Sequence, residues 1–133
     1  MNRRKARDRA FKMLFEYDFK SDTSPMDFYT ENTEGDEDAR EDEYIKTAFF
    51  GVLENLEAID EKIGNNSKRW DKKRISKVAM NIMRLSVFEI ENMEDVPANI
   101  SINEAVALAK KYETEKVPEF INGVLGAIVK ENG

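Results

Sequence analysis

The chain has 133 residues, a common size for one domain, and 41% of them are hydrophobic while 36% are charged. It has no Cys and no His, which excludes disulfides, thiolate chemistry and the most common general base and metal ligand. It also has no run of about 18 apolar residues and no secretory signal pattern. We therefore expect one globular, cytoplasmic domain over residues 1–133 that contacts no membrane, has no catalytic residue, cofactor or metal, and acts by binding.

The net charge of −6 is unevenly distributed along the chain. Residues 1–12 carry six cations against Asp8 alone, whereas residues 22–61 carry 14 acids against Arg40 and Lys46. An anion is therefore attracted by one part of the chain and repelled by another. We expect the acidic segment to fold on a different face from the basic N-terminal segment.

Apolar residues at three- and four-residue spacing predict an amphipathic helix over residues 3–19. One apolar face consists of Ala6, Ala10, Met13, Leu14 and Tyr17. A second stripe consists of Phe11, Phe15 and Phe19. We favour a core position for this second stripe, because large aromatic side chains are usually buried, and we keep the surface of a partner as the alternative.

The middle of the chain predicts one loop and one long helix. Residues 21–40 contain Gly35 and many acids, and predict a loop around a short helix near residues 26–29. Residues 42–63 repeat apolar side chains at helical spacing and predict a single helix. The Gly-Asn-Asn-Ser run at residues 64–67 ends it, since Gly and Asn adopt the left-handed conformation common at helix C-termini.

A second basic cluster covers residues 68–77 and includes Trp70. Cations beside an aromatic ring can stack on and neutralise a nucleic acid. A single Trp near a helix start is more often an anchor in the core, and this is the interpretation that we favour. Beyond the cluster, residues 75–90 are apolar on most sides of a helix and predict the central helix of the domain.

A further helix is predicted after the Val-Pro pair at residues 96–97. Ser101 and Glu104 form a capping-box pattern, in which each side chain bonds to the backbone amide of the other residue. The helix is therefore expected to begin at Ser101 and to continue to about Tyr112.

Pro118 suits the first turn of a last helix. Phe120 stands off its apolar face and is either a packing plug or an exposed stacking platform. Gly123 and Gly126 lie opposite that face, where they could permit close approach of another backbone. No strand pattern is found, so an all-α fold is predicted.

Three stretches of the chain together resemble the NusB family of bacterial transcription antitermination factors. The arginine-rich residues 3–10, followed by Leu-Phe at 14–15, are similar to the family's first helix, and residues 82–90 are similar to its central helix. The most specific likeness is C-terminal, at residues 95–97, 102–106, 108–112 and 118–125. The likeness spans nearly the whole chain and is weakest over residues 22–45.

The resemblance implies an all-α fold of about seven helices in two three-helix bundles packed crosswise, without catalysis. It implies binding of single-stranded boxA-type RNA, usually together with the small-subunit ribosomal protein NusE. Through this complex the family reaches RNA polymerase and other Nus factors, and suppresses premature termination in ribosomal RNA operons. We expect the same role here, and the oligomeric state of the free protein, including a homodimer, is left open.

The resemblance also implies site residues by matched position. RNA-phosphate contacts are implied for Arg3, Arg4, Lys5 and Arg7, and a place on the same RNA surface for Lys116 and Phe120. Asn122 is our candidate for reading base edges, because phosphate contacts alone carry no sequence information. The candidates for the interface with the ribosomal protein are Phe15, Ala79 and Arg84.

The sequence departs from the family pattern at two places. Ala79-Met80 stands where the family commonly has an Asp-Arg pair, and Glu113 stands where the family usually has the Gly that closes a helix. The first departure bears on polar contacts with the ribosomal protein. The second requires the turn after Tyr112 to close differently.

Two other functions are weighed against RNA binding. The main alternative is a helical protein-interaction adaptor or homodimer without specific RNA binding, in which the stripe of Phe residues is the interface. A module of an RNA methyltransferase system is less favoured, because no glycine-rich cofactor segment is present.

Overall fold

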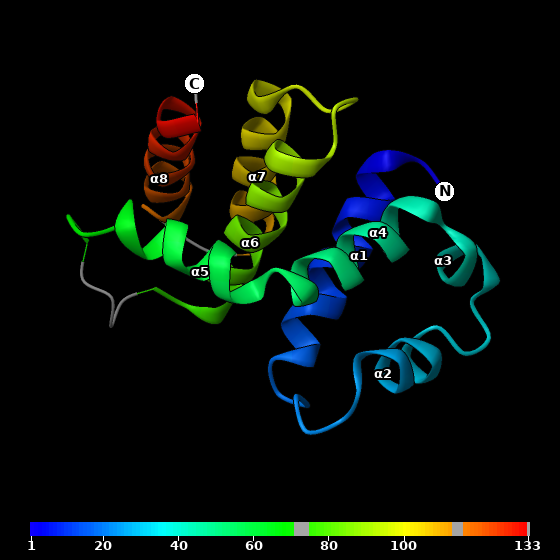
Figure 1. The fold of residues 1–133 in the computed structure, drawn as a ribbon. Helices are drawn as coiled ribbons and strands as arrows, with labels where there is room; N and C mark the ends of the chain where they lie inside the picture. The colour runs from blue at the N-terminus through cyan, green and yellow to red at the C-terminus, as the bar shows by residue number, and fades with distance from the viewer. Residues whose placement is uncertain (71–74, 113–115, 133) are drawn as a thin grey trace. The chain divides into compact units, whose positions relative to one another are not determined.

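Eight α-helices and no strand are found in the computed structural model, which describes residues 1–70, 75–112 and 116–132 (Figure 1). The helices are α1 (Arg3–Tyr17), α2 (Pro25–Asn32), α3 (Glu37–Glu41), α4 (Glu43–Glu54), α5 (Leu56–Asn65), α6 (Lys77–Asn92), α7 (Ala98–Tyr112) and α8 (Val117–Asn132). The all-α prediction is confirmed, with eight helices in the described ranges where about seven were expected. None of these helices combines the length and apolar character that a membrane span needs.

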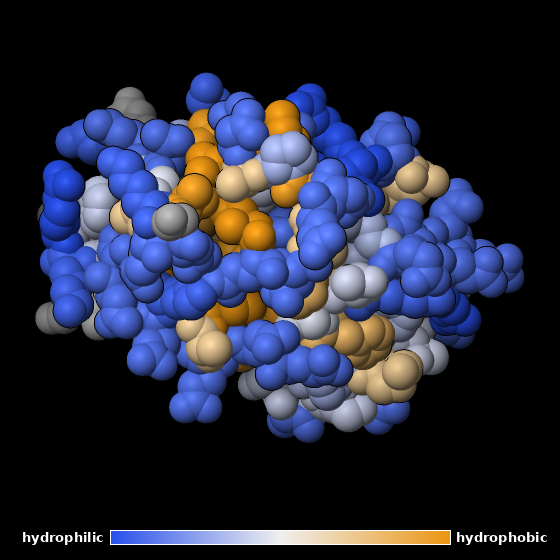
Figure 2. All heavy atoms as spheres, turned by 45° about the horizontal axis from the view of Figure 1, so that its top comes forward, coloured by the Kyte–Doolittle hydropathy of each residue, from blue (hydrophilic) through white to orange (hydrophobic). Residues whose placement is uncertain are grey.

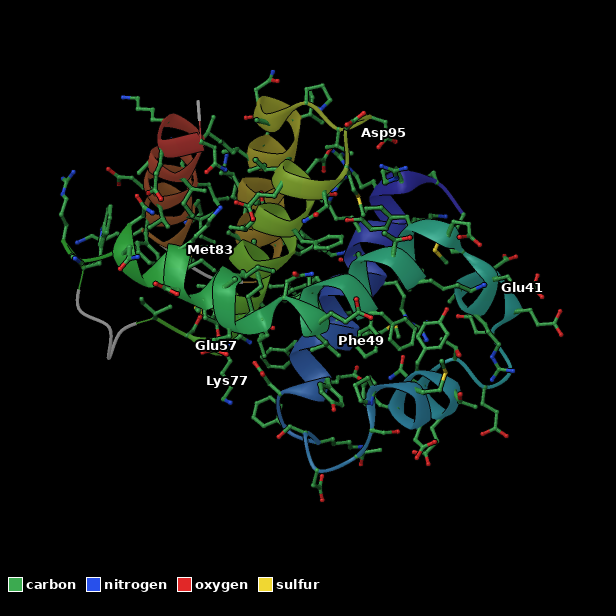
Figure 3. All side chains as sticks on the ribbon, viewed as in Figure 1. Glu41, Phe49, Glu57, Lys77, Met83 and Asp95 are labelled. Atoms are coloured by element: carbon green, nitrogen blue, oxygen red, sulfur yellow. The ribbon has the colours of Figure 1, made fainter. Side chains whose placement is uncertain are left out.

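Contacts divide the chain into a first unit, Met1–Glu54, and a second unit, Asn55–Gly133. In the first unit α1 packs against α2 and α4, and α3 packs against α4. Aromatic rings from three of these helices meet around Phe49, which is fully buried (Figure 3). Its ring centroid lies 5.7 Å from that of Phe28 and 5.9 Å from that of Tyr17. This cluster is the core of the first unit.

In the second unit α6 packs against α5, α7 and α8, as predicted for a central helix. Most of its residues are buried, among them Ile82, Met83, Leu85 and Val87. The predicted apolar face of α8 is also mostly buried, at Ile121, Val124, Leu125 and Ile128.

Hydrophilic side chains cover most of the face seen in Figure 2, as the charged composition leads one to expect.

The prediction of one helix over residues 42–63 is wrong, because the chain leaves helical geometry at Asn55. This residue has φ −112° and ψ 16° and separates α4 from α5. Asn is a poor helix former that favours helix starts. The apolar spacing continues across the break through Val52, Leu56 and Ile59, so periodicity alone did not reveal it.

The segment 21–40 is more helical than predicted. It contains α2, whose N-cap Ser24 accepts a hydrogen bond from the amide of Asp27, and α3, whose N-cap Asp36 accepts one from the amide of Ala39. The acids Glu37 and Asp38 lie in the first turn of α3, where they suit the helix dipole. The acidic run that predicted a loop is thus the N-terminus of a short helix.

The capping-box prediction for Ser101 is also wrong. Helix α7 begins three residues earlier, directly after Pro97, and Ser101 is 0% exposed inside it. Its hydroxyl donates to Oε1 of the buried Glu89 at 2.7 Å and lies 2.8 Å from Oγ of Ser86. These three polar side chains join α6 to α7 within an otherwise apolar contact.

Trp70 packs against α8 in the second unit. A Cβ on Gly123 would lie 3.3 Å from Cη2 of the indole, so this glycine makes room for the side chain of Trp70. The sequence alone suggested another backbone at this position. Nothing lies within 4 Å of a Cβ built on Gly126. Trp70 packs against α8 as an anchor would, but it is only half-buried, so it lies at the edge of the core and not inside it.

The buried hydroxyl of Ser101 predicts a measurable loss of stability on its removal. Ser101→Ala leaves the Glu89 carboxylate without one of its donors and should lower the free energy of unfolding by about 1–3 kcal/mol in denaturant titrations. Asn103→Ala, an exposed change on the same helix, is the matched control. Equal stability of the two variants would contradict the buried network.

Substitution of Ala at each of the two glycines of α8 should affect stability and Trp fluorescence differently. Gly126→Ala should stabilise the protein by up to about 1 kcal/mol through helix propensity and leave the emission of Trp70 unchanged. Gly123→Ala should gain less, because the indole must shift, and should change that emission. Trp70 is the sole Trp of the chain, so its fluorescence reports the surroundings of this one indole. Identical spectra for the two variants would be the contrary result.

Candidate nucleic-acid-binding site

Three exposed cations occupy the first turn of α1: Arg3, Arg4 and Lys5. Asn2 caps this turn, since its side chain accepts a hydrogen bond from the amide of Lys5 at 2.8 Å. The N-terminal end of a helix dipole also favours an anion. The turn therefore presents cationic side chains and the positive end of the dipole together.

Arg7 differs from the other three predicted phosphate contacts, because it is only 4% exposed. Its guanidinium lies 5.6 Å from the ring centroid of Tyr44 on α4, and that of Arg3 lies 4.7 Å from the same ring. Cations are attracted to the face of an aromatic ring. Tyr44 thus holds two neighbouring positive charges at the start of α1, a role that no local pattern in the sequence indicated.

The acidic segment lies beside α1, and not on a different face as expected. Nη1 of Arg9 donates to Oδ2 of Asp36 at 2.9 Å, and Nη2 donates to the carbonyl oxygen of Asn32 at 2.9 Å. The Asn32 amide donates in turn to Oε2 of Glu16 at 2.8 Å. The positive charge of Arg9 is therefore balanced within the first unit.

The second group of predicted RNA contacts lies at the start of α8 in the second unit. Lys116 is exposed and has a φ of 69°, and the amide of Phe120 donates to its carbonyl oxygen. Phe120 is half-buried, and its ring centroid lies 5.0 Å from that of Trp70 with the planes at 64°. Asn122 is exposed on the next turn. Phe120 is thus a packing neighbour of Trp70 that keeps part of its surface accessible.

The stripe of Phe residues changes from core to surface between α1 and the turn that follows it, since Phe19 lies beyond Tyr17, the last residue of α1. Phe11 is buried, Phe15 is half-buried and Phe19 is 62% exposed. The rings follow one another at centroid distances of 6.2 Å and 5.3 Å. Both interpretations of the stripe thus apply to part of it, because its first ring belongs to the core and its last ring faces outward.

The other two predicted partner contacts lie within the packing of α6. Ala79 is buried. Arg84 forms a bidentate ion pair with Asp60 of α5, with Nε at 2.7 Å from Oδ1 and Nη2 at 2.8 Å from Oδ2. This paired geometry fixes the guanidinium, so Arg84 holds α5 and α6 together. Asp60 lies 24 residues earlier and was not singled out from the sequence.

Two features of the sequence analysis lie outside the described residues: residues 71–74 of the second basic cluster, and Glu113. Among the described residues, no group of three or more Asp or Glu side chains is arranged to hold a metal ion.

Comparisons with known proteins agree with this arrangement. The sequence matches the NusB family over residues 4–130. It is 40% identical over 132 residues to the transcription antitermination protein NusB of Clostridium novyi (strain NT), covering 98% of this chain and 99% of that protein. It is 43% identical over 134 residues to the protein of the same name from Thermoanaerobacter sp. (strain X514), covering 100% of this chain and 94% of that protein.

Solved structures show the same fold. NusB of T. maritima has a TM-score of 0.78 and 35% identity, with 98% of this chain and 92% of that chain covered. A crystal structure of antitermination factors NusB and NusE in complex with dsRNA has a TM-score of 0.81 and 32% identity, with 97% and 96% covered. Because the family match spans nearly all of the sequence, the chain belongs to the NusB family.

Proposed function

We propose that the protein is a cytoplasmic transcription antitermination factor that binds single-stranded boxA-type RNA together with the ribosomal protein NusE. It acts during transcription of ribosomal RNA operons and reaches RNA polymerase and other Nus factors through this complex. Residues 1–133 act as one RNA-binding domain, and the protein is not an enzyme.

The observation that carries the proposal is the exposed cationic first turn of α1 in a chain whose net charge is −6. Lys and Arg neutralise phosphates and release counterions. Because the net negative charge of the protein disfavours RNA in general, binding of RNA requires a local cationic site such as this one. The names of its relatives support the same role, since they are transcription antitermination proteins. A similar solved structure holds NusB and NusE with double-stranded RNA. For this chain we propose a single strand, because Phe120 suits an unpaired base.

The proposed RNA contacts differ in how directly they act. Arg3, Arg4 and Lys5 bind phosphates, and Arg7 adds positive charge from its buried position over the Tyr44 ring. On the second unit, three side chains complete the proposed set: Lys116 for a phosphate, Phe120 for a base face and Asn122 for a base edge.

The proposed contacts with the partner lie on both units and differ in how directly they act. Phe15, followed by the exposed Phe19, offers aromatic area to NusE. Ala79 and Arg84 contribute by fixing α6, since the first is buried and the second is paired with Asp60.

Reversing the charge of the first turn tests the proposal. About four neutralised phosphates give a slope of log K against log salt near −3 on a single strand. Arg4→Glu with Lys5→Glu should weaken binding of boxA-type RNA at least about tenfold at low salt, and should reduce the slope by about 1.4. Labelled RNA and a scrambled RNA, each with and without NusE, are titrated across a salt series.

The matched control is Lys20→Glu with Lys46→Glu, which makes the same change of charge at two cations of the first unit outside the proposed site. It should bind RNA nearly as well as the unchanged protein. If both pairs lower affinity equally, or if neither does, the adaptor or homodimer alternative gains. Retention of NusE by the Arg4 and Lys5 variant would show that its fold and partner surface are intact.

The Arg9–Asp36 pair predicts that the acidic segment limits binding to unrelated RNA. Neutralising Glu34, Asp36, Glu37 and Asp38 removes the negative charge that pairs with Arg9 and should raise affinity for scrambled RNA about fivefold at low salt, which corresponds to about 1 kcal/mol. The control neutralises four exposed acids elsewhere: Glu54, Glu57, Glu61 and Glu94. An equal rise in the control would assign the effect to net charge alone, and no rise in either variant would remove the proposed limit.

A further inference from the structure

The segment that follows α5 is fixed to α8 at two points. The side-chain amide of Asn66 donates to Oε2 of Glu131 at 3.0 Å, near the C-terminal end of α8. Four residues later, the Trp70 indole lies against Gly123 and Phe120. Between these points Ser67 is fully buried, and its carbonyl oxygen accepts a hydrogen bond from the amide of Trp70. The segment therefore runs along α8 in a defined conformation.

This docking brings cations to the aromatic pair of Trp70 and Phe120. Lys68 and Arg69 are exposed, and the guanidinium of Arg69 lies 5.2 Å from the centroid of the Trp70 ring. Lys116 is exposed one turn before Phe120. Glu119 is the exposed acid next to Phe120 in the sequence. Within residues 66–70 and 116–120, which the structure describes, three cations therefore stand against this one acid, and the charge contributed by these two segments is positive.

The combination is the one that binds a nucleotide of a single strand. Bases stack on aromatic rings and on guanidinium planes, while Lys and Arg neutralise the adjoining phosphates. Both rings are only half-buried, so each retains surface for a further contact. Because the segment is already docked, little conformational entropy would be lost on binding.

We infer that Lys68, Arg69 and Trp70, with Phe120, form a nucleotide subsite in which a base of single-stranded RNA stacks beside the Trp70 indole and its phosphate binds Arg69 and Lys68. The inference rests on the proposed RNA-binding function and extends it to the second basic cluster, which the resemblance left without a role. The subsite lies within the second unit and consists of described residues only.

The fluorescence of Trp70 tests the subsite directly. Titration of the full chain with boxA-type RNA should quench its emission to a plateau, because a stacked base quenches an indole. Polyphosphate of matched charge, which has no bases, should give no such plateau. Absence of quenching by RNA that is shown to bind by anisotropy would overturn the inference.

Variants separate binding from packing. Lys68→Ala with Arg69→Ala should weaken RNA binding at least about fivefold and reduce the salt slope by about 0.7, the value for one phosphate on a single strand. Trp70→Leu keeps an apolar side chain against Gly123 and should also lose at least about fivefold in affinity, since stacking contributes about 1–3 kcal/mol per base. Lys20→Ala with Lys46→Ala is the matched control and should bind unchanged. Thermal unfolding of each variant identifies those that fail through loss of structure.

The results distinguish failure of the subsite from failure of the proposed function. If the Arg4 and Lys5 reversal abolishes RNA binding while the Lys68 and Arg69 variant binds normally and Trp70 is silent, the function stands and the subsite is wrong. If the unchanged protein binds neither boxA-type nor scrambled RNA, both are wrong. If Trp70→Leu unfolds, the Lys68 and Arg69 pair and the quenching of the unchanged protein still decide the matter.

Discussion

The ion pair between Arg9 and Asp36 determines how α1 presents its positive charge. It ties the acidic segment to the middle of the helix, and Asp8 pairs with Lys12 one turn further along the same helix, at 3.2 Å. Arg9 and Lys12 in the body of α1 thus each have an acid at hand, and Arg3, Arg4 and Lys5 are exposed at its first turn. The positive charge of α1 is thus concentrated at its first turn. A polyanionic ligand can bind there although the net charge of the protein is −6.

Aromatic rings order the cations in both units. Tyr44 receives the guanidinium groups of Arg3 and Arg7 in the first unit, and Trp70 receives that of Arg69 in the second. A guanidinium that lies on a ring retains its charge and loses part of its rotational freedom. Less entropy is then lost when such a side chain binds a phosphate than when a fully mobile one does. The ring contacts are therefore a form of preorganisation for anion binding.

Periodicity predicted the helices whose apolar faces are continuous, and local chemistry decided the rest. Helices α1, α6 and α8 lie close to the predicted ranges because each buries one long apolar face. The break at Asn55 escaped prediction, since the spacing of apolar residues continues through it. Ser101 matched a capping pattern that its burial overrides, and no single-sequence pattern distinguishes an exposed cap from a buried donor.

The candidate site shows the same limit. The cationic start of α1 and the place of Phe120 near the start of the last helix were predicted from residue type and family likeness, and their part in RNA binding stays a proposal. The burial of Arg7 against Tyr44 and the pairing of Arg84 with Asp60 join residues 37 and 24 positions apart, and sequence spacing carries no information on such contacts.

The buried polar group formed by Ser86, Glu89 and Ser101 has a consequence for how this protein can change over time. A carboxylate enclosed between two helices tolerates loss of a donor poorly, whereas joint replacement of all three by apolar groups of similar shape costs little. Substitution at any one position therefore creates pressure on the other two. The residues at these three positions should therefore covary among related sequences, so that all three are kept or all three are replaced.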